Sequence, residues 1–138
     1  MSKIAVIYWS GTGNTQQMAE AIANQAHADL FTASEFSPEK AANYDAFAFG
    51  CSAMGAEQLE ESEFEPMFSD LEGSLNGKKV ALFGSYGWGD GQWMRDWEAR
   101  MSGAGATIVG GEGVICQEAP DADAIEQCKA LGKALANA

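Results

Sequence analysis

The chain has 138 residues, of which 46% are apolar, and this suits one domain with a sizeable buried core. Its 20 acidic and 8 basic residues give a formal net charge of −12. That charge argues against nucleic acid as a partner, because the phosphates would be repelled, and it suits a protein that meets basic partners.

The cysteines and the N-terminal segment indicate the cellular compartment in which the protein is expected. Cys51, Cys116 and Cys128 follow no C-x-x-C spacing and are odd in number, which argues against a zinc site or a disulfide framework and favours free thiols. The six apolar residues after Lys3 are too few for a signal peptide, and no apolar run reaches the length of a membrane span. The sequence therefore predicts a cytoplasmic protein.

Strand-like and helix-like runs alternate along the chain. Strands are predicted at residues 3–9, 29–34, 46–51 and 79–84, and a last strand is predicted at 107–109 and 113–116, broken by Gly110 and Gly111. Helices are predicted at 14–28, 64–71, 93–102 and from 121 to the C-terminus, with a short one opening at Ser37-Pro38. This order predicts a single α/β domain over residues 1–138, with five parallel strands covered by helices on both faces.

Three unusual loops follow strands in this scheme, at residues 10–15, 52–57 and 85–91. The carboxyl ends of parallel strands lie at one edge of the sheet, where such folds bind ligands. We therefore expect the three loops to converge there and form the binding site.

The first loop is typical of an anion site without a cation. It offers hydroxyl, amide and backbone N–H donors at the start of a helix, but no lysine or arginine lies between Lys3 and Lys40. The lysine of a phosphate-binding G-x-x-x-x-G-K-[ST] loop is absent, and Gln16 occupies the last glycine position of a G-x-G-x-x-G pattern. The residues favour a phosphate monoester held by neutral donors, with a purely structural turn as the alternative.

The second and third loops each place a large polarizable or aromatic side chain among small ones, namely Met54 and Trp88. Trp93 and Trp97 lie on a predicted helix and can pack on the core, whereas Trp88 stands between two glycines. A flat ring held between Met54 and Trp88 would explain both residues. A flat ring together with a phosphate describes flavin mononucleotide (FMN).

At this point the chain resembles the flavodoxins, and in particular the short-chain kind of anaerobic (clostridial-type) bacteria. The resemblance rests on "YWSGTGNT" (8–15), "GCSAMGAEQLEESEFEP" (50–66) and "KKVALFGSYGWGDGQWMRDWE" (78–98). It implies a flavodoxin-like doubly wound sheet with strand order 2-1-3-4-5. FMN is then expected between strands 1 and 3, and flavodoxin is the standard example of a ligand bound where the strand order reverses.

The resemblance also implies roles for individual residues. The FMN phosphate is expected at Ser10, Thr12, Asn14, Thr15 and Ser52. Met54 and Trp88 are expected on the two ring faces, Glu57 at the flavin N3–H, and the Gly55 carbonyl at N5–H after the first electron and proton. The full expected FMN site comprises Ser10, Gly11, Thr12, Gly13, Asn14, Thr15, Ser52, Ala53, Met54, Gly55, Ala56, Glu57, Ser85, Tyr86, Gly87, Trp88, Gly89 and Asp90.

One position departs from the family pattern. Ala56 stands where such flavodoxins usually carry Asp or Asn, residues that tolerate turn conformations better than alanine does. The energy of the loop change, and with it the redox potentials, can therefore differ from those of the family.

These residues predict a low-potential, one-electron carrier with non-covalently bound FMN, cycling mainly between neutral semiquinone and anionic hydroquinone. The anion would lie near Glu57, Glu60, Glu61 and Asp90, whose negative charges disfavour it. Basic redox proteins, such as flavoprotein reductases and iron–sulfur oxidoreductases, are expected to dock at an acidic face near residues 57–65. The alternative is that these residues only form a solvated surface with no docking role. No membrane partner is expected, and the sequence does not require a dimer.

Other functions fit the sequence less well than an electron carrier, and no catalytic residue is predicted. The C-x5-R spacing of a phosphatase nucleophile fails, because Glu57 occupies the arginine position after Cys51. A response-regulator receiver needs an aspartate at the end of strand 3, where Gly50-Cys51-Ser52 stands. An FMN enzyme such as a quinone reductase remains the alternative, although Met54 and Trp88 would close both ring faces.

Overall fold

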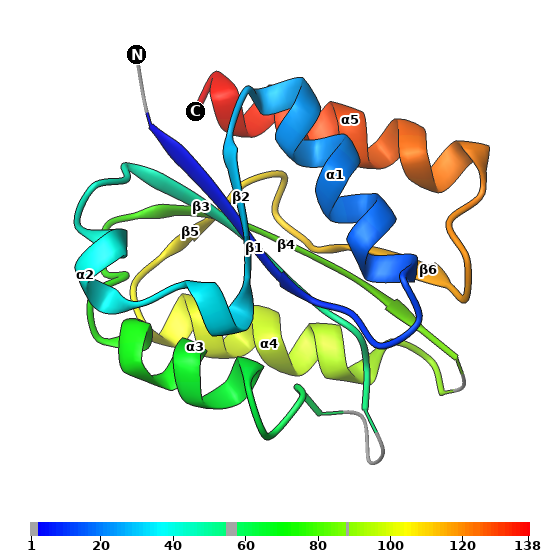
Figure 1. The fold of residues 1–138 in the computed structure, drawn as a ribbon, viewed down its shortest axis with the longest axis horizontal. Coiled ribbons are helices and arrows are strands. Elements are labelled where there is room, and N and C mark those ends of the chain that lie inside the picture. The colour runs from blue at the N-terminus through cyan, green and yellow to red at the C-terminus, as the bar shows by residue number, and fades with distance from the viewer. Residues whose placement is uncertain (1–2, 55–57, 88) are drawn as a thin grey trace.

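A computed structural model describes residues 3–54, 58–87 and 89–138. Its centre is a parallel sheet in the order β2-β1-β3-β4-β5, with β6 also paired to β4, which confirms the predicted fold (Figure 1). The strands are β1 (Ile4–Trp9), β2 (Asp29–Thr32), β3 (Ala46–Cys51), β4 (Lys79–Tyr86), β5 (Thr107–Ile108) and β6 (Val114–Gln117).

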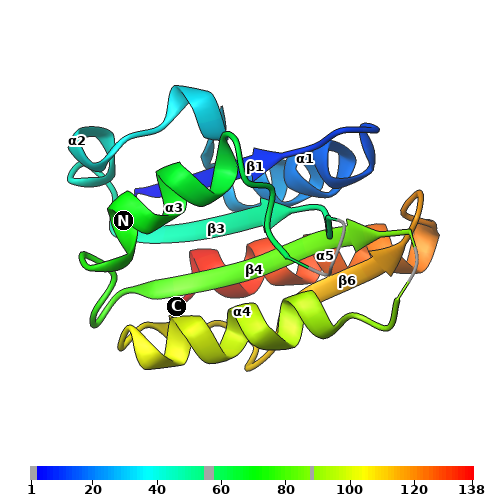
Figure 2. The same cartoon turned by 90° about the horizontal axis from the view of Figure 1, so that it is seen from below.

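Helices cover both faces of the sheet. They are α1 (Asn14–Ala26), α2 (Pro38–Ala41), α3 (Phe64–Glu72), α4 (Gln92–Gly103) and α5 (Ala122–Ala136), with a 3-10 turn, η1, at Ala33–Glu35. Helices α1 and α5 lie side by side on one face, and α3 and α4 lie on the other (Figure 1, Figure 2). Within the described ranges, every helix is too short or too polar to cross a membrane.

The central strand β1 shows why its sequence is continuously apolar. Ile4, Val6 and Tyr8 belong to the core beneath α1 and α5, whereas Ala5 and Ile7 belong to the core beneath α3 and α4. Successive side chains of a strand point to opposite faces, so a strand buried on both faces needs apolar residues at every position. Trp93 and Trp97 lie in the second of these cores, as predicted, and are 1% and 2% exposed.

Two strand ends differ by two residues from their predicted positions, and the other differences are of one residue. Strand β4 continues through Ser85 and Tyr86, predicted as loop, because β6 pairs with it there. Strand β2 stops at Thr32, because the Thr32 N–H and hydroxyl donate to the Glu35 carboxylate and close η1. The predicted break in the last strand is confirmed: Gly110 and Gly111 have φ of 84° and 83°, a conformation that suits glycine.

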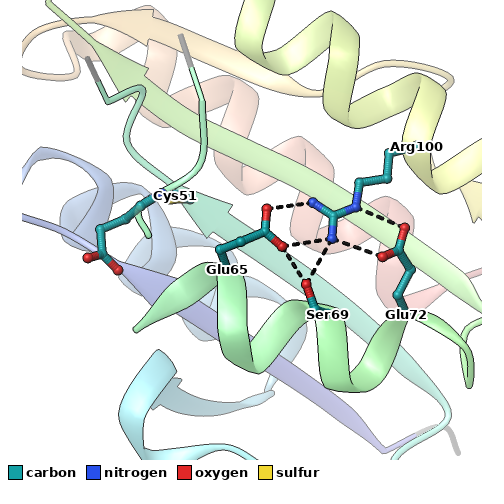
Figure 3. Close-up of polar contacts among 6 residues, drawn as sticks. Cys51, Glu65, Ser69, Glu72 and Arg100 are labelled. Carbon is teal, nitrogen blue, oxygen red and sulfur yellow. Dashed lines mark hydrogen bonds and ion pairs between the residues drawn. The ribbon is translucent and has the colours of Figure 1, made fainter. Parts of the chain in front are cut away.

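A charged cluster joins α4 to α3 (Figure 3). The Arg100 guanidinium donates to both carboxylate oxygens of Glu65 at 2.8 Å, and to those of Glu72 at 2.8 and 2.9 Å. The central guanidinium carbon, Cζ, also lies 4.8 Å from the centre of the Phe68 ring. Hydrogen bonds from Arg100 hold the pKa of Glu65 below its usual value, although burial opposes this.

Arg100→Met is expected to lower the free energy of unfolding by about 2 kcal/mol at neutral pH, since two half-buried carboxylates lose their partner. A carboxyl with a lowered folded-state pKa stabilises the protein above its unfolded pKa, about 4.3, and this stabilisation is lost as the pH falls through the folded value. The difference in free energy of unfolding between wild type and Arg100→Met should therefore become smaller as the pH falls from about 5 to about 3, which is roughly the range in which a glutamate titrates. Urea denaturation at several pH values measures it.

Arg95→Met is the matched control for this prediction. Arg95 pairs with Asp90 at 3.3 Å, but the two side chains are 52% and 76% exposed. Exposed ion pairs contribute little, so a change of under about 0.5 kcal/mol is expected. A loss at Arg100 that stays constant down to acid pH would contradict the role given to its ion pairs.

Candidate functional site

A cavity of about 470 Å³ opens at the carboxyl ends of β1, β3 and β4. This volume lies in the range of roughly 300–1,000 Å³ that is usual for ligand pockets. The lining residues are Trp9, Gly11, Thr12, Asn14, Ser52, Ala53, Met54, Ser85, Tyr86, Gly87 and Glu118. Residues from all three predicted loops therefore meet at one edge of the sheet, as expected.

The first loop places the N-terminus of α1 at this cavity. Gly13 precedes the helix with φ of 90°, a left-handed conformation that a side chain would strain. Its N–H donates to the Ser10 hydroxyl oxygen at 3.0 Å, which closes the turn. Among the described residues, no side chain caps the N-terminus of α1, and its first turn carries no acid. The helix end is therefore able to hold an anion through its N–H groups.

Thr15 holds the three loops together from beneath the cavity. Its hydroxyl lies 2.8 Å from the Ser52 hydroxyl and accepts the Ser85 N–H at 3.2 Å, and the residue is fully buried. These contacts join the first turn of α1, the residue after β3 and the end of β4 at one atom. Thr15 is thus not one of the residues that line the cavity, and a contact of its own with phosphate remains a prediction.

Several other predicted site residues do not line the cavity. Ser10 and Gly13 shape the turn just described. Gly89 and Asp90 lie beyond the lining residues, and the Asp90 carboxylate is exposed and paired with Arg95. Gly55, Ala56, Glu57 and Trp88 lie outside the described residues, so the roles implied for them remain predictions.

Two lining residues, Trp9 and Glu118, are not among the predicted site residues. Glu118 has φ of 58°; its N–H donates to the Tyr86 carbonyl at 2.7 Å, and its own carbonyl accepts the Ser85 hydroxyl at 2.6 Å. The signal was present in the sequence, because the segment after the last strand must lie at the same sheet edge as the other loops. Trp9 is the last residue of the first predicted strand, and nothing in that apolar run marks it as a ligand contact.

The thiol of Cys51, which directly precedes the lining residue Ser52, is not activated. Burial raises its pKa to about 12, so it stays protonated at neutral pH. Cys116 and Cys128 are also free thiols. The residues that the structure describes contain no group of three or more histidine, cysteine or acidic side chains placed to hold a metal ion.

The donor set and walls of the cavity fit FMN. Thr12, Asn14 and Ser52 surround the uncapped end of α1 with neutral donors, which suits a phosphate. Ala53, Met54 and Tyr86 give apolar and aromatic surface, which suits a flat ring. When bound, FMN would supply one-electron redox chemistry, which none of the side chains lining the cavity provides.

Comparisons with known proteins agree with this fit. The flavodoxin family model matches residues 6–132. The chain is 50% identical over 137 residues to the flavodoxin of Clostridium beijerinckii, covering 96% of this chain and 98% of that protein. It is 46% identical over 140 residues to that of Megasphaera elsdenii, covering 98% and 99%. The solution structure of two-electron reduced Megasphaera elsdenii flavodoxin superposes with a TM-score of 0.86 at 42% identity, over 98% of this chain and 99% of that one. The chain therefore belongs to the flavodoxin family, short-chain clostridial type, whose members carry electrons on FMN.

Proposed function

We propose that residues 1–138 act as a single FMN domain that carries one electron at a time at low potential, cycling mainly between neutral semiquinone and anionic hydroquinone. The observation that carries this proposal is the charge of the cavity wall. Of its described lining residues, Glu118 alone is acidic, and none is a lysine or arginine. A further negative charge placed there meets no cation and is disfavoured.

The phosphate strengthens this effect. We propose that Thr12, Asn14 and Ser52 hold it with neutral groups, so its charge is not compensated locally. Two like charges about 10 Å apart repel each other by on the order of 2 kcal/mol at an effective dielectric constant of about 20. The net charge of −12 adds to this repulsion. The protein thus favours FMN forms that carry less negative charge.

The proposed partners are basic redox proteins, such as flavoprotein reductases and iron–sulfur oxidoreductases, but the docking face is narrower than the sequence suggested. Glu60 is only 6% exposed, and the Glu65 carboxylate is paired with Arg100, so we propose the acidic face at residues 57–65 without the charges of these two glutamates. Glu61 and Glu63 are exposed and support docking through charge. A cytoplasmic location remains a prediction from the sequence.

An anaerobic titration with dithionite, followed by absorption, tests the proposal. The purified protein should show flavin bands, pass through a long-wavelength blue form after one electron, and give a second couple more negative than that of free FMN. A second couple no lower than that of free FMN would contradict the low-potential role. Bleaching in a single two-electron step would favour a hydride-transferring enzyme instead.

A further inference from the structure

Glu60 is a buried carboxylate at the start of α3. One of its oxygens accepts the N–H groups of Glu63 and Phe64 at 2.8 and 2.9 Å. The other accepts the N–H of Ser62 at 2.8 Å and the Ser62 hydroxyl. The N-cap residue of α3, Glu63, makes no capping bond with its own side chain, so Glu60 satisfies the free N–H groups there.

The backbone of Glu60 is fixed as well as its side chain. Its N–H donates to the sulfur of Cys51 at 3.4 Å, and Cys51 is the last residue of β3 and fully buried. Its carbonyl accepts the N–H of Glu65 at 2.8 Å, inside α3. Glu60 therefore ties the end of a central strand to the beginning of a helix.

This tie lies two residues from Gln58, which is bridged to the wall of the cavity. Gln58 and Met54 exchange two backbone hydrogen bonds, at 2.9 and 3.1 Å, and form a short antiparallel bridge. Met54 lines the cavity, and Ala53, its neighbour there, donates its N–H to the Ser85 carbonyl at 3.0 Å. One side of the Met54 wall is thus anchored through Ser85, and the other through Gln58 and Glu60.

We propose that Glu60 is a positioning residue for the cofactor site: its carboxylate, bound to the N-terminus of α3, fixes the Met54–Gln58 bridge and thereby the cavity wall that faces the FMN ring. This role rests on the proposed function. It differs from a surface charge that repels reduced flavin, because the carboxylate is buried and its charge is matched by four donors.

The two roles predict opposite signs for FMN binding. If Glu60 acted only as a negative charge, its removal would tighten the binding of anionic FMN. If it positions Met54, its removal loosens one anchor of the wall and weakens binding. Glutamine is the suitable replacement, because its amide oxygen can still accept two donors while its NH2 group faces the other two.

The experiment compares Glu60→Gln with Glu61→Gln in the full chain. Glu61 is exposed, and an amide oxygen there can still accept the Gln58 side chain, which donates to it at 2.6 Å. Both changes remove one charge from adjacent positions. We expect Glu60→Gln to weaken FMN binding about tenfold, equivalent to about 1.4 kcal/mol, and Glu61→Gln to leave it equal or tighter.

Two further readouts separate positioning from general stability. In the apoprotein, the methyl resonance of Met54 should shift in Glu60→Gln and not in Glu61→Gln. In the loaded protein, Glu60→Gln should change the separation between the two one-electron potentials more than Glu61→Gln does. If Glu60→Gln does not fold, Ser62→Ala removes one of the four donors without changing the charge and should shift the same readouts in the same direction.

The outcomes are distinct. A folded Glu60→Gln that matches Glu61→Gln in affinity, Met54 resonance and potentials overturns the inference, as does one that loses stability alone. Wild-type protein that binds no FMN overturns the proposed function instead, and the Met54 resonance of the apoprotein still tests the anchoring by Glu60.

Discussion

Asn14→Asp is expected to weaken FMN binding on the order of a hundredfold while it stabilises the apoprotein by about 0.5 kcal/mol. Asn14 is the first residue of α1 and lines the cavity. An acid at a helix N-terminus is favourable on its own, but here it occupies the place where the phosphate charge is expected. Fluorescence titration measures the affinity, and urea denaturation of the apoprotein measures the stability.

Riboflavin, which lacks the phosphate, is the control ligand for this substitution. Its affinity should be nearly the same for wild type and Asn14→Asp, because asparagine and aspartate have the same shape and differ in charge. Salt screens the repulsion, so the defect in FMN binding should also become smaller as ionic strength rises. Equal losses for FMN and riboflavin would show that residue 14 acts through local structure rather than through charge at a phosphate.

The elements of the fold were predictable where local sequence determines them. Strand β1 follows from a run of apolar residues that a strand buried on both faces needs. Helix α2 begins at Pro38 after Ser37, whose hydroxyl accepts the Lys40 N–H, as the sequence predicted. The convergence of the three loops follows from the parallel order of the strands alone.

Two features that depend on the folded chain were not predictable in this way. Ser85 and Tyr86 belong to β4 because Cys116 and Gln117 pair with them, some 30 residues later in the chain. Glu60 looked like one member of an acidic surface run, and only the position of the α3 N-terminus buries it and gives it donors. In the first case a distant pairing decides the outcome. In the second case the donors lie only two to four residues away, on Ser62, Glu63 and Phe64, but they converge on the carboxylate only where α3 begins.

Gly84→Ala is expected to lower the free energy of unfolding by about 3 kcal/mol and to weaken FMN binding at the same time. A Cβ atom at residue 84 would lie 2.3 Å from the Cys51 carbonyl oxygen and 3.1 Å from the Trp93 ring. The carbonyl cannot move freely, because it belongs to β3 and accepts the Trp93 indole N–H at 3.2 Å. Strands β3 and β4 must therefore separate where Ser52 and Ser85 begin the cavity wall.

Gly103→Ala provides the matched control for this strand position. Gly103 ends α4, and a Cβ atom there would meet nothing within 4 Å, so the change should stabilise the protein by up to about 1 kcal/mol through helix propensity. Urea denaturation and FMN titration of both variants compare the same added methyl group at the two sites. If Gly84→Ala were as stable as wild type, β3 and β4 could not be packed as closely as the 2.3 Å approach to the Cys51 carbonyl requires. If it lost stability but bound FMN normally, the strand contact would support the fold without shaping the cavity.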